Sequence, residues 1–153
     1  MANDALKIRC AEANDAQTIA DFNIRMALET ESLHLDAPTV LGGVRAALGD
    51  PSKAIYFLAE INGAVAGQLM ITHEWSDWRN GDIWWIQSVY VHPDYRRRGV
   101  FKALYQFVEQ EARAAAVVGI RLYVERANVI ARRTYEELGL CSSHYELMEK
   151  FLK

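Results

Sequence analysis

The sequence predicts a mixed α/β fold in which one mixed sheet carries helices on its faces. Two observations predict the sheet. Asn62-Gly63 separates two apolar segments, as in a β-hairpin, and residues 83–91 form a long, almost wholly apolar run. A third observation predicts helical cover, because apolar residues recur at helical spacing between residues 101 and 115. The expected order of elements is β-α-α-β-β-β-α-β-α-β.

The N-terminal part is expected to form one strand and two helices before the hairpin. Residues 6–10 alternate as in a short strand, and the next segment opens with the capping residues Asn14 and Asp15. A shorter helix is expected to begin at Pro38, since proline suits the first helical turn. Residues 74–82, which contain a second Asn-Gly pair, are expected to form a loop.

The C-terminal part is expected to alternate helices and strands. Residues 83–91 are typical of a strand buried on both faces. A helix is expected from Gly99 to about residue 116, then a strand over 120–125. A second helix should end at Gly139, because glycine commonly terminates helices. The alternating segment 144–152 predicts a final strand.

Composition limits the classes of function. A chain of 153 residues fits one domain, expected over 1–153. The net charge of −3 gives no general attraction to nucleic acid or anionic membrane, so any anion site must be local. Cys10 and Cys141 are far apart and share no metal-ligand spacing with histidine, which favours free thiols and predicts no metal. Without an apolar leader or a run long enough to span a bilayer, a cytoplasmic location is expected.

Three arginines, Arg96, Arg97 and Arg98, directly precede a predicted helix N-terminus. A helix N-terminus carries partial positive charge, so adjoining cations are unfavourable unless an anion lies among them. Gly99 would allow phosphate oxygens to approach the backbone closely. Taken alone, the cluster is more often a solvated loop, and the common phosphate-loop patterns GxxxxGK[ST] and GxGxxG are absent from the sequence.

Two neighbouring segments favour the anion site. Upstream, a buried strand ends in Val91-His92-Pro93; downstream, a further helix and strand precede "NVIARRTYEELG". The pattern of strand, HPxYRxxGx, helix, strand and NxxAxxxYxxxG closely resembles the GNAT superfamily of acyl-CoA-dependent N-acetyltransferases. The resemblance covers nearly the whole chain in element order and is strongest over residues 86–140. It implies a mostly antiparallel sheet with splayed central strands, acetyl-CoA as co-substrate, and an amine acceptor.

The resemblance also assigns residues to the cofactor. Val89, Tyr90 and Val91 match the strand segment that pairs with the pantetheine arm beside a bulge, and the N–H of Val89 would stabilise the oxyanion. The loop whose main-chain donors wrap the pyrophosphate corresponds to Arg96, Arg97, Arg98, Gly99, Val100, Phe101 and Lys102. Phe101 departs from the small residue usual in the family, and helical spacing predicts that its ring turns into the core.

Two residues of the last helix match functional positions of the family. Asn128 matches a residue that contacts the pantetheine arm, although a helix N-cap explains it equally well. Tyr135 matches the general acid that protonates the departing thiolate. Tyr135 also shares a helical face with Ala131 and Leu138, where a tyrosine of the core is common.

The general base and the acceptor are less defined. The central strand contains no carboxylate, which leaves a water relay to Glu29, Glu31 or Glu74, each of which is also typical of a solvated surface. In the family, the connection between the first two helices borders the acceptor, so Glu29 and Glu31 could receive a cationic amine. Trp85 could form a cation–π wall there, whereas Trp84 must face the opposite side of its strand.

The sequence therefore predicts an acetyl-CoA-dependent N-acetyltransferase. It would move acetyl to a primary amine of a small molecule or a protein by direct attack in a ternary complex, without nucleic acid or membrane partners. A CoA-binding sensor without catalysis is the alternative. A homodimer formed through the aromatic strands is also compatible with the sequence.

Overall fold

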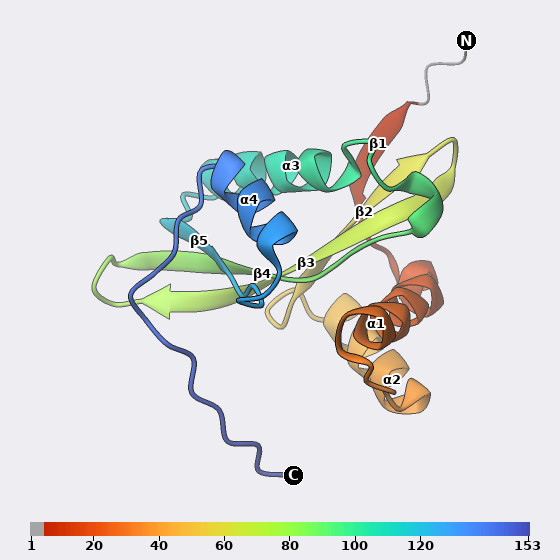
Figure 1. Ribbon diagram of the computed structural model, residues 1–153, viewed down its shortest axis with the longest axis horizontal. Helices are drawn as coiled ribbons and strands as arrows, with labels where there is room; N and C mark the ends of the chain where they lie inside the picture. Colours follow the sequence, from red (N-terminus) through yellow and green to blue (C-terminus); the bar gives the residue numbers. More distant parts are fainter. Residues whose placement is uncertain (1–4) are drawn as a thin grey trace. The chain divides into compact units, whose positions relative to one another are not determined.

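The computed structural model describes residues 5–153 and contains one five-stranded sheet (Figure 1). The elements along the chain are β1 (Leu6–Cys10), α1 (Ala16–Glu31), α2 (Ala37–Leu48), β2 (Ile55–Ile61), β3 (Ala64–Ser76), β4 (Gly81–Val91), α3 (Val100–Ala114), β5 (Gly119–Leu122) and α4 (Val129–Glu137). Contacts divide the chain into two compact units, one ending at Leu122 and the other spanning Tyr123–Lys153. The expectation of a single domain stays a prediction.

The sheet is mixed and mostly antiparallel, as predicted. Its strand order is β1-β2-β3-β4-β5, and only the β4–β5 pair is parallel among the described strands. Pairing between β4 and β5 stops at Ile86↔Leu122, although β4 continues to Val91. The last residues of β4 thus lie beyond its pairing with β5.

The hairpin predicted at Asn62-Gly63 joins β2 and β3. Asn62 and Gly63 both have positive φ, 51° and 80°, and Ile61 pairs with Ala64. Two central residues with positive φ are the requirement of a type I′ turn, whose twist matches that of the flanking strands. The prediction is confirmed.

Helices cover both faces of the sheet (Figure 1). On one face, Leu58 of β2 belongs to a buried cluster with Ile19 of α1 and Val44 of α2. On the other face, Phe57 of β2 meets Phe107 of α3, with ring centroids 5.5 Å apart. Successive strand residues point to opposite faces, so this one strand contributes to both layers.

The prediction that residues 83–91 are buried on both faces holds only at the start of the strand, where the successive residues Ile83 and Trp84 are both buried. Trp84 and Ile86 are buried, but Trp85 and Gln87 on the opposite face are only half-buried. Thr72 of β3 pairs with Trp85, and its hydroxyl accepts a hydrogen bond from Gln87 Nε2 at 2.8 Å. This face carries polar side chains, so it cannot be sealed like an apolar layer.

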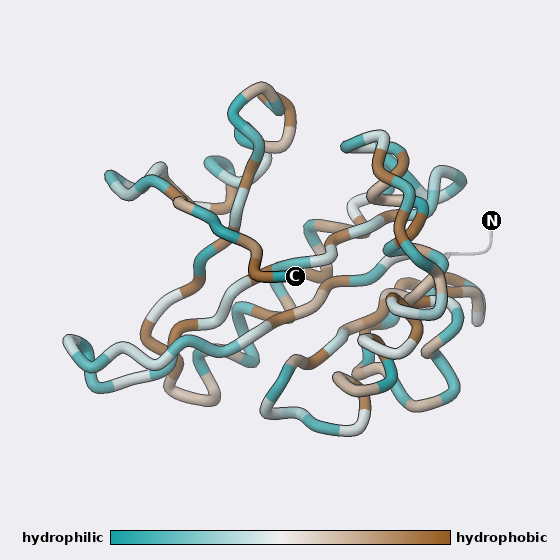
Figure 2. The backbone as a smooth tube through the Cα atoms, turned by 90° about the horizontal axis from the view of Figure 1, so that it is seen from below, coloured by the Kyte–Doolittle hydropathy of each residue, from teal (hydrophilic) through white to brown (hydrophobic). Residues whose placement is uncertain are grey.

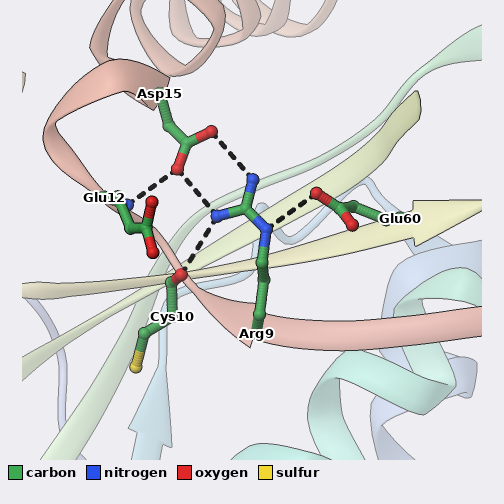
Figure 3. A network of polar contacts seen from close by, with 5 residues as sticks. All are labelled: Arg9, Cys10, Glu12, Asp15 and Glu60. Carbon is green, nitrogen blue, oxygen red and sulfur yellow. Dashed lines mark hydrogen bonds and ion pairs between the residues drawn. The ribbon is translucent and has the colours of Figure 1, made fainter. Parts of the chain in front are cut away.

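The start of α1 differs from the expected cap. Residues Ala13–Asp15 form a short 3₁₀ turn, and Asp15 makes no side-chain cap bond to α1. Instead, the Asp15 carboxylate accepts hydrogen bonds from Arg9 at 2.8 and 2.9 Å and from the Glu12 N–H at 2.7 Å. Arg9 Nε also donates to Glu60 at 2.7 Å (Figure 3). This network joins β1, the start of α1 and β2.

Asp15→Asn should lower the free energy of unfolding by about 1–2 kcal/mol at pH 7, because a partly buried charged hydrogen bond is lost. The Arg9 hydrogen bonds hold the pKa of Asp15 below its usual value. The stabilisation is therefore present above the unfolded pKa of about 3.9 and is lost as pH falls through the folded pKa. Urea unfolding measured from pH 6 to pH 2.5 should show that the difference in unfolding free energy between the wild type and Asp15→Asn shrinks as pH falls. Asp21→Asn, at an exposed aspartate, serves as the control. A gap independent of pH would contradict the assignment.

The final strand predicted over 144–152 is wrong, because residues 140–153 contain neither helix nor strand. Hydrophobic and hydrophilic residues follow one another along the segment that leads to the C-terminus (Figure 2). Its large apolar and aromatic side chains are exposed: Tyr145, Leu147, Met148, Phe151 and Leu152. A strand needs a neighbour that pairs its backbone groups. Alternation of apolar residues does not supply that neighbour. Among residues 5–153, no helix is long and apolar enough to cross a membrane.

Candidate active site

A β-bulge lies near the end of β4. Pairing between β3 and β4 passes from Gln68↔Tyr90 to Met70↔Gln87, so two β4 residues, Ser88 and Val89, stand opposite one β3 residue. Ser88 has a left-handed backbone, with φ of 50°. A bulge turns backbone groups out of the regular ladder. The bulge expected from the family pattern is therefore present, at the segment predicted to face the thioester.

The N-terminus of α3 follows the three arginines. Gly99 caps the helix with φ of 74°, and the first intrahelical bond runs from the Ala103 N–H to the Gly99 carbonyl at 3.0 Å. N–H groups before this bond point out of the helix end, where the helix dipole is positive. A Cβ on Gly99 would meet no atom within 4 Å. The left-handed backbone, rather than lack of space, therefore favours glycine here.

A close approach holds the bulged strand and the helix start together. A Cβ on Gly67 of β3 would lie 3.0 Å from the Tyr90 carbonyl oxygen and 3.0 Å from Val100 Cγ1. Val100, the first residue of α3, is buried. The absence of a side chain at Gly67 thus allows the end of β4 and the start of α3 to pack closely against the same point of β3.

Arg96 joins β4 to α1. Its Nη2 donates to Glu29 at 2.8 Å, and its Nε donates to the Val91 carbonyl at 2.9 Å. The Tyr90 hydroxyl donates to the second Glu29 oxygen at 2.9 Å. The Arg96 hydrogen bond, followed by that of Tyr90, lowers the pKa of Glu29. A lowered pKa makes a carboxylate a weaker base, so Glu29 is poorly suited to deprotonate an amine.

The charged side chains that follow Arg96 in the predicted phosphate loop lie at the surface, whereas Val100 is buried. Lys102 is exposed, and the guanidinium carbon of Arg98 lies 5.6 Å from the centroid of the Tyr95 ring. Phe101 is half-buried, with its ring centroid 6.3 Å from that of Tyr105. The ring of Phe101 is thus less buried than expected, whereas Leu104, Val108 and Ala112 of the same helical face are buried.

A polar cluster lies on the half-open face of β4. Trp85 Nε1 donates to Glu74 at 3.1 Å, and Arg121 of β5 donates to the other Glu74 oxygen at 2.7 Å. The Arg121 guanidinium also lies 5.9 Å from the Trp85 ring centroid. Trp85 is therefore held by a carboxylate and an arginine. Its indole face already receives one cation.

The second unit carries the two predicted residues of α4. Asn128 Oδ1 accepts a hydrogen bond from the Ala131 N–H at 3.1 Å, so the N-cap role is confirmed, while its cofactor contact stays a prediction. Tyr135 is half-buried, and burial raises the pKa of its hydroxyl above the usual value. Gly139, with φ of 95°, follows the helix end as predicted.

Gln68 was missed by sequence reasoning. Its side chain is fully buried, and Nε2 donates to Asn23 Oδ1 at 2.8 Å and to the Ser88 carbonyl at 3.1 Å. A glutamine within the apolar run 64–71 was a usable signal, because a buried amide needs partners. Those partners become visible only with the register of the bulge. Among residues 5–153, no group of three or more His, Cys, Asp or Glu residues could hold a metal ion.

Comparisons with known proteins agree with these features. A family model described as "Acetyltransferase (GNAT) family" matches residues 19–140. A crystal structure of a possible acetyltransferase from Clostridium difficile 630 is 42% identical, with a TM-score of 0.91, and the alignment covers 97% of this chain and 98% of that one.

More distant structures share the fold. A ribosomal-protein-alanine N-acetyltransferase from Brucella melitensis is 19% identical, with a TM-score of 0.79 and coverage of 96% and 99%. A predicted acetyltransferase from Clostridium acetobutylicum, solved with acetyl-CoA, is 16% identical, with a TM-score of 0.79 and coverage of 95% and 96%. The family match spans the bulged strand, the arginine loop and α4. The chain therefore belongs to the acetyltransferase (GNAT) family, whose members are N-acetyltransferases that move acetyl groups from acetyl-CoA to amines.

Proposed function

We propose that this protein transfers acetyl from acetyl-CoA directly to a primary amine of a small molecule or a protein, with both substrates bound together. One observation carries the proposal: the end of β4, which contains the bulge at Ser88–Val89, and the start of α3, which Gly99 caps, both pack closely against Gly67. Displaced backbone N–H groups at the bulge suit a carbonyl oxygen that gains negative charge. The N–H groups at the helix start suit phosphate.

The cofactor would be held mainly by backbone groups. Residues 89–91 would pair with the pantetheine arm, and the loop over residues 97–102 would surround the pyrophosphate. Asn128 would contact the pantetheine arm while it caps α4. Arg96 would act differently from its neighbours in the loop, because its guanidinium is engaged by Glu29 and Val91. Its proposed role is to position the loop.

The chemistry would need one oxyanion donor and one proton donor. As the amine nitrogen bonds to the acetyl carbon, the carbonyl oxygen gains charge that the Val89 N–H would stabilise, an interaction worth about 2.7–4 kcal/mol. The carbon–sulfur bond then breaks, and Tyr135 would protonate the departing thiolate. A raised pKa keeps Tyr135 protonated at neutral pH. The ammonium proton would leave to water, and positioning of the two substrates would supply most of the remaining acceleration.

Two measurements test this function. Calorimetric titration should show CoA binding, and acetyl-CoA with a panel of primary amines should release free thiol together with an equal amount of acetylated amine. CoA binding without thiol release from any amine, amino acid or peptide would indicate the sensor role instead. Absence of CoA binding would reject both roles.

A further inference from the structure

A pocket opens between α1, α2, their connection and the bulge of β4. Its volume is about 440 Å³, a size usual for small-molecule sites. Its apolar walls include Met26, Leu33, Leu35 and Val40. Ser88 also lines the pocket. The pocket therefore reaches the backbone segment that the proposed function places at the thioester.

The end of the pocket near Ser88 is polar, and a buried glutamine fixes its polar groups. Asn23 and Ser88 both line the pocket, and Gln68 Nε2 donates to the side chain of the first and to the carbonyl of the second. Gln68 is fully buried, and its Oε1 accepts no hydrogen bond within the part of the chain that the structure describes. An amide with no exposed surface thus fixes two groups at this end, because loss of either bond would leave buried polar atoms unpaired.

The charge of the pocket has one sign. Among the described residues that line it, Glu31 is the one ionisable side chain, and no arginine, lysine or histidine is present. Glu31 is the last residue of α1, where the helix dipole adds negative potential. An ammonium group is therefore attracted to this pocket. A carboxylate would find no cation in its lining and would be repelled by Glu31.

We infer that the acceptor is a primary amine with an apolar body and no carboxylate, such as an arylalkylamine or alkylamine, rather than an α-amino acid. This inference rests on the proposed function. Glu31 attracts the ammonium form, and the walls formed by Met26, Leu35 and Val40 receive the apolar body. The amino group reaches the Ser88 end, loses its proton to water, and forms the new N–C bond as the C–S bond breaks.

Three matched acceptors test the charge preference: phenylethylamine, phenylalanine and phenylalaninamide. The amide has nearly the size of the amino acid without its negative charge, so it separates charge from shape. With saturating acetyl-CoA, kcat/KM for phenylethylamine and for the amide should exceed that for phenylalanine at least about ten-fold, since like charges brought together are strongly unfavourable. Because the three amino groups differ in basicity, calorimetric titration with CoA present should give the same order of affinities without chemistry.

Substitutions in the pocket test which residues cause the acceptor preference. Glu31→Gln should raise KM for phenylethylamine up to about five-fold with kcat nearly unchanged, the size expected for one exposed charge. Glu31→Arg should narrow or reverse the preference against phenylalanine. Leu35→Ala should weaken the binding of phenylethylamine more than that of ethylamine, which is too small to contact the apolar walls of the pocket. Glu111→Gln on the exposed part of α3 changes net charge equally and should alter neither constant.

The outcomes separate the two proposals. If thiol is released but kcat/KM for phenylalanine equals or exceeds that for phenylethylamine, the acceptor inference is overturned and the transfer function stands. If no acceptor releases thiol, the transfer function fails, and the calorimetric order of the three ligands still decides the pocket preference. If Glu31→Gln and Glu111→Gln behave alike, the assigned role of Glu31 is wrong.

Discussion

Tyr135→Phe should lower kcat for acetyl transfer about 100-fold or more while leaving the affinity for CoA nearly unchanged. The substitution keeps the ring and removes only the hydroxyl, so the thiolate must leave without a positioned proton donor. General acids contribute about 10²–10⁴-fold to enzymatic rates. Single-turnover thiol release and CoA titration, measured on the same preparations, separate the loss of chemistry from any loss of binding.

The pH profile gives this prediction a second readout. Tyr135 must be protonated to donate, and burial raises its pKa above the usual value of about 10. The wild-type rate should therefore show no decrease from this group below about pH 10 and should decline only as pH rises through the raised pKa. Tyr145→Phe, at an exposed tyrosine of the same unit, is the matched control and should leave the rate unchanged. If Tyr135→Phe transferred acetyl at the wild-type rate, the assignment of Tyr135 as general acid would be wrong.

Gly67→Ala should destabilise the protein by about 1–3 kcal/mol, the usual cost of overpacking. The added methyl would lie 3.0 Å from both the Tyr90 carbonyl oxygen and Val100 Cγ1, so the end of β4 and the buried Val100 side chain would each have to shift slightly. Because the two proposed donor segments meet here, kcat/KM should also fall about ten-fold, as expected from a displacement of less than 1 Å. Urea unfolding and steady-state kinetics measure the two effects.

Gly43→Ala provides the matched comparison. Gly43 lies within α2, and a Cβ there would meet no atom within 4 Å. The same chemical change should stabilise the protein by about 0.5–1 kcal/mol, because alanine favours the helix and restricts the unfolded chain. Equal effects of the two substitutions on stability and activity would show that the approach at Gly67 has no special role.

Local signals predicted most of the secondary structure. Asn62-Gly63 identified the hairpin, and the spacing of Leu104 and Val108 identified the buried face of α3. These features depend on residues close together in sequence, where turn conformation and helical periodicity act directly. The family pattern added the bulge, which composition and spacing alone do not reveal.

Long-range partners account for what the sequence did not predict. Asp15 was expected to cap a helix, but its partner Arg9 lies on β1 and is oriented together with Glu60 on β2. Glu29 was considered as a base, yet Arg96, distant in the sequence, occupies its carboxylate. Gln68 likewise finds its partners only once the β4 register is shifted by the bulge. Each of these roles depends on tertiary register rather than on neighbouring residues.

The ion pair between Glu29 and Arg96 also affects how the two substrates could influence each other. Glu29 lies in the last turn of α1, next to Thr30 and Glu31 of the pocket wall, while Arg96 leads into the loop before α3. This ion pair therefore links that loop to the helical turn that borders the pocket. Any energetic coupling transmitted through this bond must be reciprocal, so donor binding that tightens acceptor binding is itself tightened by the acceptor to the same degree.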